Sequence, residues 1–87
     1  MIAISYKPSF VRQVRGLEKD LRDEVLEKIE LFKSEKNHRA LKVHKLHGPL
    51  AGRWSFSVNY KTRIIFNYET KDEAVLLAIG DHDVYRN

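Results

Sequence analysis

The sequence contains no cysteine, so the protein forms no disulfide and has no thiolate to serve as a nucleophile or metal ligand. This absence is compatible with a reducing cytoplasm. No apolar run reaches the length of a transmembrane helix. The first ten residues, MIAISYKPSF, lack the long apolar core of a signal peptide. We therefore expect a soluble, cytoplasmic protein that does not associate with membranes.

Acidic residues are missing from one long stretch, Lys36 to Tyr68, which has no Asp or Glu. The same stretch carries seven Lys or Arg residues and three of the four histidines, while the whole chain has a net charge of +4. A surface of one sign attracts a polyanion, and nucleic acid is the commonest polyanion in cells. The alternative is an ordinary solvated basic face on a small domain.

Glycines are few and scattered, and Gly48, Gly52 and Gly80 form no phosphate-binding loop. No Ser-His-Asp spacing indicates a hydrolase triad. His44 and His47 could be read as metal ligands, but the chain has no cysteine and its one carboxylate-rich neighbourhood lies near His82, at Asp81 and Asp83. We therefore expect neither a metal nor a cofactor.

The apolar pattern in the first half of the chain predicts one strand and two helices. Ile2, Ile4 and Tyr6 alternate with small residues, as in a short strand, and Pro8 suits the first turn of a helix. Gly16 separates this helix from a second. The second helix has an apolar stripe that we expect to fade near Lys36 and Asn37; its members are Leu21, Val25, Ile29 and Phe32, widened by Leu17 and Leu26.

The second half of the chain predicts three strands and a short extra one near Val43–Leu46. The order is then β-α-α-β-β-β in a single domain, residues 1–87. We expect an α+β fold with two N-terminal helices on one face of a mostly antiparallel sheet. Alternation assigns Trp54, Phe56, Val58 and Tyr60, with Ile64, Phe66 and Tyr68, to the core face. The other face would carry Arg53, Ser55, Ser57, Asn59 and Arg63.

Cations, histidines and a tyrosine without a paired carboxylate suit cleavage of RNA through its own 2′-hydroxyl. That reaction needs a base, an acid and a cation near the developing phosphorane charge. Arg63 suits charge stabilisation because it does not lose its proton, and His82 suits proton transfer near neutral pH. Each candidate also has a structural reading: Arg63 as an exposed strand cation, His82 as a turn residue and Tyr85 as a packing residue.

The segment Leu46 to Arg86 resembles the bacterial RelE/ParE toxin superfamily. The resemblance rests on the Leu50/Gly52 loop, Trp54-Ser55, Arg63-Ile64-Ile65-Phe66, the apolar strand Val75–Ile79, and the ending from Gly80 to Tyr85. Element order and length agree, so the resemblance covers the whole chain.

This resemblance implies the toxin of a type II toxin–antitoxin pair. RelE-like members cleave mRNA in the ribosomal A site without metal, using the 2′-hydroxyl. Arg63 matches the family's catalytic strand arginine, Tyr85 its C-terminal tyrosine, and His82 a basic catalytic position. His47 aligns loosely with a loop histidine.

The sequence also departs from the pattern of the family. Ser55 and Ser57 stand where RelE has lysines, and Ser57 and Lys61 stand where the YafQ-like branch has a histidine and an aspartate. The assignment of acid and base is therefore open. The remaining candidates for RNA and ribosome binding are Lys45, His47, Arg53, Lys61 and Arg86.

The expected partners are a cognate antitoxin with an acidic amphipathic segment, the ribosome with its rRNA, and mRNA in the A site. Operator DNA would be reached only through the antitoxin. Two alternatives stay open: a ParE-like inhibitor of DNA gyrase, and a non-catalytic binding or co-repressor protein with the same fold.

Overall fold

The computed structural model describes residues 1–81 and has an α+β fold, as the sequence predicts. Predictions that concern His82, Tyr85 and Arg86 lie outside the described residues. The elements follow one another as β1 (Ala3–Tyr6), α1 (Pro8–Arg15), α2 (Lys19–Phe32), η1 (Glu35–Asn37), β2 (His44–Lys45), η2 (Gly48–Leu50), β3 (Trp54–Ser57), β4 (Arg63–Thr70) and β5 (Glu73–Gly80).

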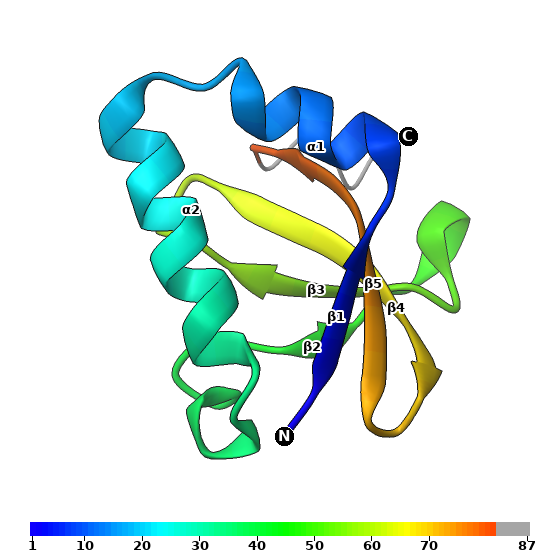
Figure 1. Ribbon diagram of the computed structural model, residues 1–87. Helices are drawn as coiled ribbons and strands as arrows, with labels where there is room; N and C mark the ends of the chain where they lie inside the picture. Colours follow the sequence, from blue (N-terminus) through cyan, green and yellow to red (C-terminus); the bar gives the residue numbers. More distant parts are fainter. Residues whose placement is uncertain (82–87) are drawn as a thin grey trace.

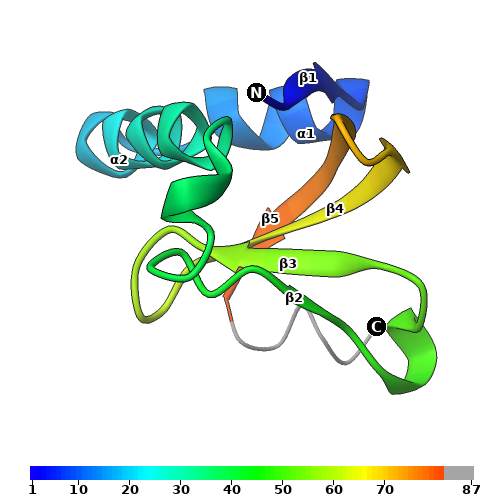
Figure 2. The same ribbon diagram turned by 90° about the horizontal axis from the view of Figure 1, so that it is seen from below.

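The five strands form one sheet in the order β1-β5-β4-β3-β2. β1 runs parallel to β5, and the other three pairings are antiparallel. Both helices lie on one side of the sheet (Figures 1 and 2). β5 lies between β1 and β4, which explains its apolar run from Ala74 to Ile79. The short extra strand predicted near Val43–Leu46 is β2.

Local sequence accounts for the ends of both helices. Pro8 begins α1, and the Gly16 N–H closes it by donating to the carbonyls of Arg12 and Gln13, both at 3.2 Å. α2 ends at Phe32, earlier than the predicted fading near Lys36 and Asn37. The His38 ring stacks on Phe32 at 4.7 Å, and its Nε2 donates to the Phe32 carbonyl at 2.7 Å. This contact satisfies a carbonyl at the end of the helix, so His38 has a structural role.

The core lies between the helices and the inner face of the sheet. Val25, Ile29 and Phe32 of α2 are buried, and the Phe32 ring stacks on Phe56 at 4.5 Å and meets the edge of Phe66 at 4.8 Å. These contacts confirm the stripe predicted for α2. Leu26, which was expected to widen that stripe, is 50% exposed.

Two residues of the predicted strand Trp54–Tyr60 differ in exposure from the prediction. Tyr60 was assigned to the core, but β3 ends at Ser57 and Tyr60 is 86% exposed in the turn that follows. Ser55 was assigned to an open polar face, but it is fully buried beside Ile65, its partner on β4. Alternation predicted the face of Ser55 correctly, but alternation does not show whether a residue on that face is buried.

Candidate functional site

Arg63 begins β4 on the face of the sheet that the helices leave uncovered. Its neighbours in register are Ser57 on β3 and Gly80 on β5. Arg63 is thus flanked by a short side chain on one strand and by no side chain on the other, and it is partly buried. An arginine in such a place can donate to two oxygens of one phosphate group.

The backbone of the β3–β4 turn holds the guanidinium. Arg63 Nη1 donates to the carbonyl oxygens of Asn59 and Thr62, the latter at 3.2 Å. Within residues 1–81, Nε and Nη2 of Arg63 make no hydrogen bond. One edge of the guanidinium is thus anchored, and the other edge can meet an anion.

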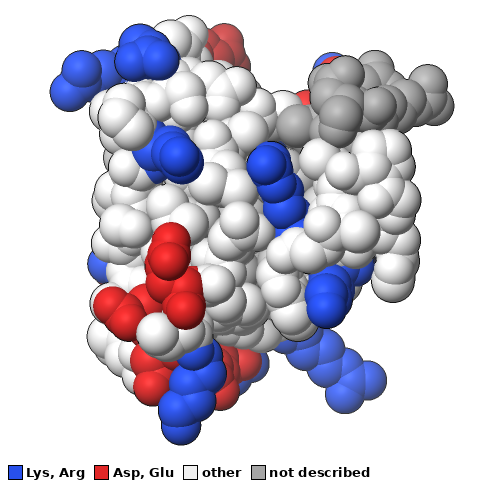
Figure 3. Space-filling view, turned by 90° about the vertical axis from the view of Figure 1, so that its right-hand side faces the viewer, with Lys and Arg blue, Asp and Glu red and all other residues white. Residues whose placement is uncertain are grey.

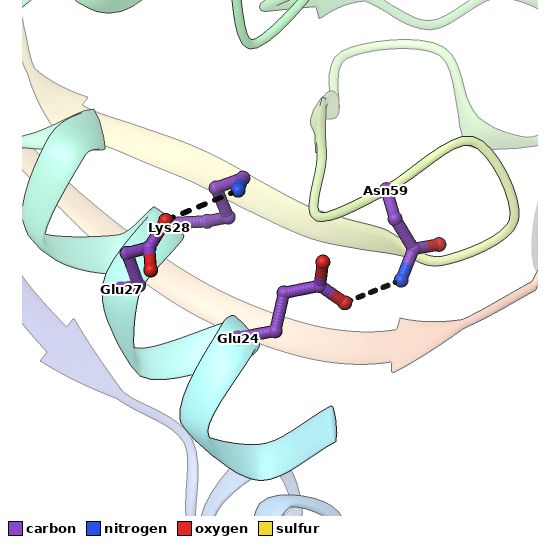
Figure 4. A network of polar contacts seen from close by, with 4 residues as sticks. All are labelled: Glu24, Glu27, Lys28 and Asn59. Carbon is purple, nitrogen blue, oxygen red and sulfur yellow. Dashed lines mark hydrogen bonds and ion pairs between the residues drawn. The ribbon is translucent and has the colours of Figure 1, made fainter. Parts of the chain in front are cut away.

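Asn59, which the sequence placed on the polar face of the strand and at the start of a turn from Asn59 to Thr62, organises this turn. Its Oδ1 accepts from the N–H groups of Lys61 at 2.9 Å and Thr62 at 2.8 Å. Its Nδ2 donates to Glu24 Oε1 of α2 at 2.7 Å (Figure 4). Asparagine favours turns because its side chain bonds the backbone two residues later. The sequence therefore indicated the turn, but it did not indicate the hydrogen bond to Glu24.

The other cationic candidates spread over three places. Lys61 is exposed in the turn, two residues before Arg63. Arg53 precedes β3 and is exposed; by alternation from Ser55 it shares the face of Arg63, toward the opposite end of β3. Lys45 pairs with Trp54 and so has the parity of the helix-covered face, and the exposed His47 precedes η2.

The structure therefore places Arg63 and Lys61 together and the other described candidates farther along the sheet. On the side shown in Figure 3, Lys and Arg side chains are dispersed rather than gathered in one patch, and acidic side chains cluster at the lower left.

His44 was considered only as a metal ligand, but it pairs with Ser55 and thus has the parity of the face that carries Arg63. Its Nδ1 donates to the Lys42 carbonyl at 2.7 Å.

A hollow of about 690 Å³ lies between α2 and the β3–β4 turn and is markedly acidic. Its carboxylates come from Glu18, Asp20, Asp23, Glu24 and Glu27. The Lys19 ammonium, 2.8 Å from Asp23, lowers the pKa of that carboxyl. An acidic surface repels phosphates, so this hollow is unfavourable for a nucleic acid.

Two classes of feature are absent from residues 1–81. No helix among them is long and apolar enough to cross a membrane. In the same part of the chain, no three His, Asp or Glu side chains gather in a way that could hold a metal ion.

Comparison with known proteins finds similarity in structure but not in sequence. No family model matches the chain, and no curated protein matches it. The archaeal RelE of the RelE–RelB complex from Pyrococcus horikoshii is similar, with TM-score 0.71, 19% identity, and coverage of 92% of this chain and 93% of that one.

Two bacterial structures are similar to a comparable degree. The YoeB–YefM complex from Staphylococcus aureus matches with TM-score 0.70 and 15% identity, over 94% of this chain and 98% of that one. YafQ from Escherichia coli matches with TM-score 0.66 and 15% identity over all of both chains. At such identities the likeness establishes the fold.

Proposed function

We propose, from the RelE-like toxin fold that this chain has, that the protein is the toxin of a type II toxin–antitoxin pair. Its proposed activity is ribosome-dependent, metal-independent cleavage of mRNA. The observation that carries the proposal is the placement of Arg63 on the face of the sheet opposite the helices, with Nη1 bonded to the turn and with Nε and Nη2 making no hydrogen bond within residues 1–81. From Gly80, beside Arg63, the chain leads on to His82 and Tyr85.

The proposed reaction uses the 2′-hydroxyl of the mRNA as nucleophile. As the 2′-oxygen bonds to the adjacent phosphorus, a base takes its proton and an acid gives a proton to the departing 5′-oxygen. The products are a 2′,3′-cyclic phosphate and a 5′-hydroxyl. Arg63 would stabilise the charge on the phosphorane, and His82 and Tyr85 are the proposed proton-transfer groups. DNA lacks the 2′-hydroxyl and is not a substrate for this route.

Binding to the ribosome and to mRNA in its A site would depend on dispersed cations. Arg53 has the parity of the face that carries Arg63, and Lys61 is exposed in the β3–β4 turn, where it also lines the acidic hollow. Lys45, His47 and Arg86 would contact rRNA or mRNA from other positions. Phosphate contacts of this kind make affinity fall steeply as salt rises.

The proposed partner is an antitoxin that carries an acidic amphipathic helix. The solved structures from P. horikoshii and S. aureus are a RelE–RelB complex and a YoeB–YefM toxin–antitoxin complex. In this chain, an apolar groove of about 170 Å³ runs between α1 and α2, lined by Tyr6, Phe10, Val11, Val14, Arg15, Leu26 and Ile29. α1 carries Arg12 and Arg15 and no acidic residue. An apolar groove with a cationic wall matches a helix with an apolar face and acidic flanks.

Cleavage mapping on programmed ribosomes tests the proposed activity. We expect the wild-type protein to arrest growth and cut mRNA in the A site. Loss of a cation that stabilises the transition state costs roughly 10²- to 10³-fold in rate, so Arg63→Ala should lower the cleavage rate by that factor. Arg39→Ala, which removes an exposed arginine from the same acid-free stretch, should leave it unchanged.

Two outcomes would contradict the proposal. One is an Arg63→Ala protein that cuts as fast as the wild type. The other is growth arrest without RNA cutting. Inhibition of gyrase supercoiling in that second case would identify the ParE-like alternative.

A further inference from the structure

The β3–β4 turn is attached to α2 by the hydrogen bond between Asn59 and Glu24 (Figure 4). We propose that Glu24 is a positioning residue that acts through Asn59 to fix the guanidinium of Arg63. This inference rests on the proposed function for its consequence in catalysis. Its structural part can be measured without any activity.

Three atoms of Asn59 make four hydrogen bonds. Oδ1 accepts from the Lys61 and Thr62 N–H groups, the backbone oxygen accepts from Arg63 Nη1, and Nδ2 donates to Glu24. The orientation of the amide is therefore set from both sides, because Oδ1 must meet N–H donors and Nδ2 must meet a carboxylate. If the amide rotates, the turn loses both bonds to Oδ1, and the carbonyls that hold Arg63 lose their support.

α2 provides a rigid support for this arrangement. Val25, the residue after Glu24, is fully buried in the core, so the backbone at Glu24 is held by packing. The bond from Asn59 goes to an ionised acceptor and is stronger than a bond between neutral groups. The helix thus holds a turn that lies 35 positions later in the sequence.

Glu27 provides a matched comparison on the same helix. Its side chain also lines the acidic hollow, but it pairs with Lys28 Nζ at 3.4 Å and not with the turn (Figure 4). Removing Glu27 therefore removes one negative charge from the same surface without touching Asn59.

The consequence for Arg63 is pre-organisation. A guanidinium already anchored through Nη1 loses less freedom when its other edge meets a phosphate. Groups held in place before the reaction stabilise developing charge without a reorganisation cost. When the tether is lost, we expect a slower chemical step with unchanged binding to ribosomes, because the cation itself is still present.

The first test measures the order of the Arg63 side chain by ¹⁵N relaxation of its Nε–H, with the amide exchange of Lys61 and Thr62. Glu24→Ala should increase the motion of Arg63 and speed exchange at both amides. Glu24→Gln keeps an acceptor for Asn59 Nδ2 and should stay close to wild type, as should Glu27→Ala. Unchanged Arg63 order in Glu24→Ala, or an equal change in Glu27→Ala, would overturn the inference.

The second test measures single-turnover cleavage on ribosomes. A displacement of about 1 Å costs roughly 10²-fold in rate, and loss of a tether alone should cost less, about three- to tenfold. The apparent affinity for programmed ribosomes should stay within about twofold, and Glu24→Gln should restore the rate. A loss in affinity alone, or a wild-type rate in Glu24→Ala, would overturn the inference.

The two tests separate this inference from the proposed function. If the wild-type protein cuts no RNA, the proposed function fails and the relaxation data still decide whether Glu24 positions Arg63. If Arg63→Ala abolishes cutting while Glu24→Ala changes neither order nor rate, the function stands and the inference fails.

Discussion

Tyr68 shows how the position of a single residue determines its chemistry. Its ring meets those of Trp54 at 5.1 Å and Phe66 at 5.2 Å, both edge to face, on the helix-covered side of β4. Burial raises the pKa of the Tyr68 hydroxyl, because the phenolate is poorly solvated there, and the charge of Glu35 adds to the shift. The neutral hydroxyl is therefore the form that suits the folded protein.

This shift predicts a loss of stability in alkali. Above the ordinary tyrosine pKa of about 10, the unfolded chain releases the Tyr68 proton while the folded protein retains it. The unfolded state then binds fewer protons, so the free energy of unfolding falls as pH rises toward the folded-state pKa. Urea unfolding between pH 8 and pH 11 should show a smaller alkaline loss for Tyr68→Phe than for the wild type. The exposed Tyr60→Phe is the control and should retain the wild-type loss.

At the scale of elements, helix α1 provides the end of β5 with hydrogen bonds that a neighbouring strand would otherwise provide. The register between β1 and β5 ends at Tyr6 and Leu76, so β5 continues beyond its neighbour. There Gln13 of α1 donates from Nε2 to the Ile79 carbonyl and accepts at Oε1 from the Ile79 N–H, both at 2.9 Å. This reciprocal pair holds the strand end that places Gly80 beside Arg63.

Gln13→Ala should therefore destabilise the protein by about 1–3 kcal/mol, the cost of leaving half-buried backbone groups unpaired. Hydrogen exchange at the Ile79 amide should speed up more than exchange at core amides of β4. Ser9→Ala, at an exposed position of the same helix, should change the free energy of unfolding by less than about 0.5 kcal/mol. Wild-type protection of Ile79 in Gln13→Ala would show that the pair contributes nothing.

At the scale of the whole molecule, the two sides of the sheet have different proposed roles. The groove between α1 and α2 lies on the helix-covered side, and Arg63 lies on the other side. An antitoxin helix in the groove would therefore bind without contacting the face that carries Arg63. Inhibition would need a second segment of the antitoxin that reaches the other side.

Leu26→Asp tests the groove, because Leu26 lines it and is half exposed. The new carboxylate would repel the acidic helix of the antitoxin. Affinity for the protein encoded by the adjacent reading frame should therefore fall at least about tenfold, and the rate of RNA cleavage by the unbound protein should stay unchanged. Leu31→Asp is the control, because Leu31 is also exposed on α2 but does not line the groove. Equal losses for both variants, or none for Leu26→Asp, would exclude the groove as the docking site. Titration of purified components by calorimetry gives the affinities.

The sequence by itself determined the order of the elements, the stripe of α2, the apolar strand β5 and the break between the two helices at Gly16. These features follow from periodicity and turn chemistry, which depend on residues close together in the chain. Alternation likewise gave the parity of Ser55 and Arg63 on the second face. The roles proposed for His82, Tyr85 and Arg86 stay predictions, because those residues lie outside the described part of the chain.

Only the tertiary structure decided which of these residues are exposed and which act together. Ser55 is buried, Tyr60 is exposed in a turn, and Lys45 takes the parity of Trp54. Glu24 reaches Asn59, and through it the carbonyls that hold Arg63. Such relations depend on contacts between segments far apart in the chain, and the pattern of neighbouring residues does not determine which of those segments meet.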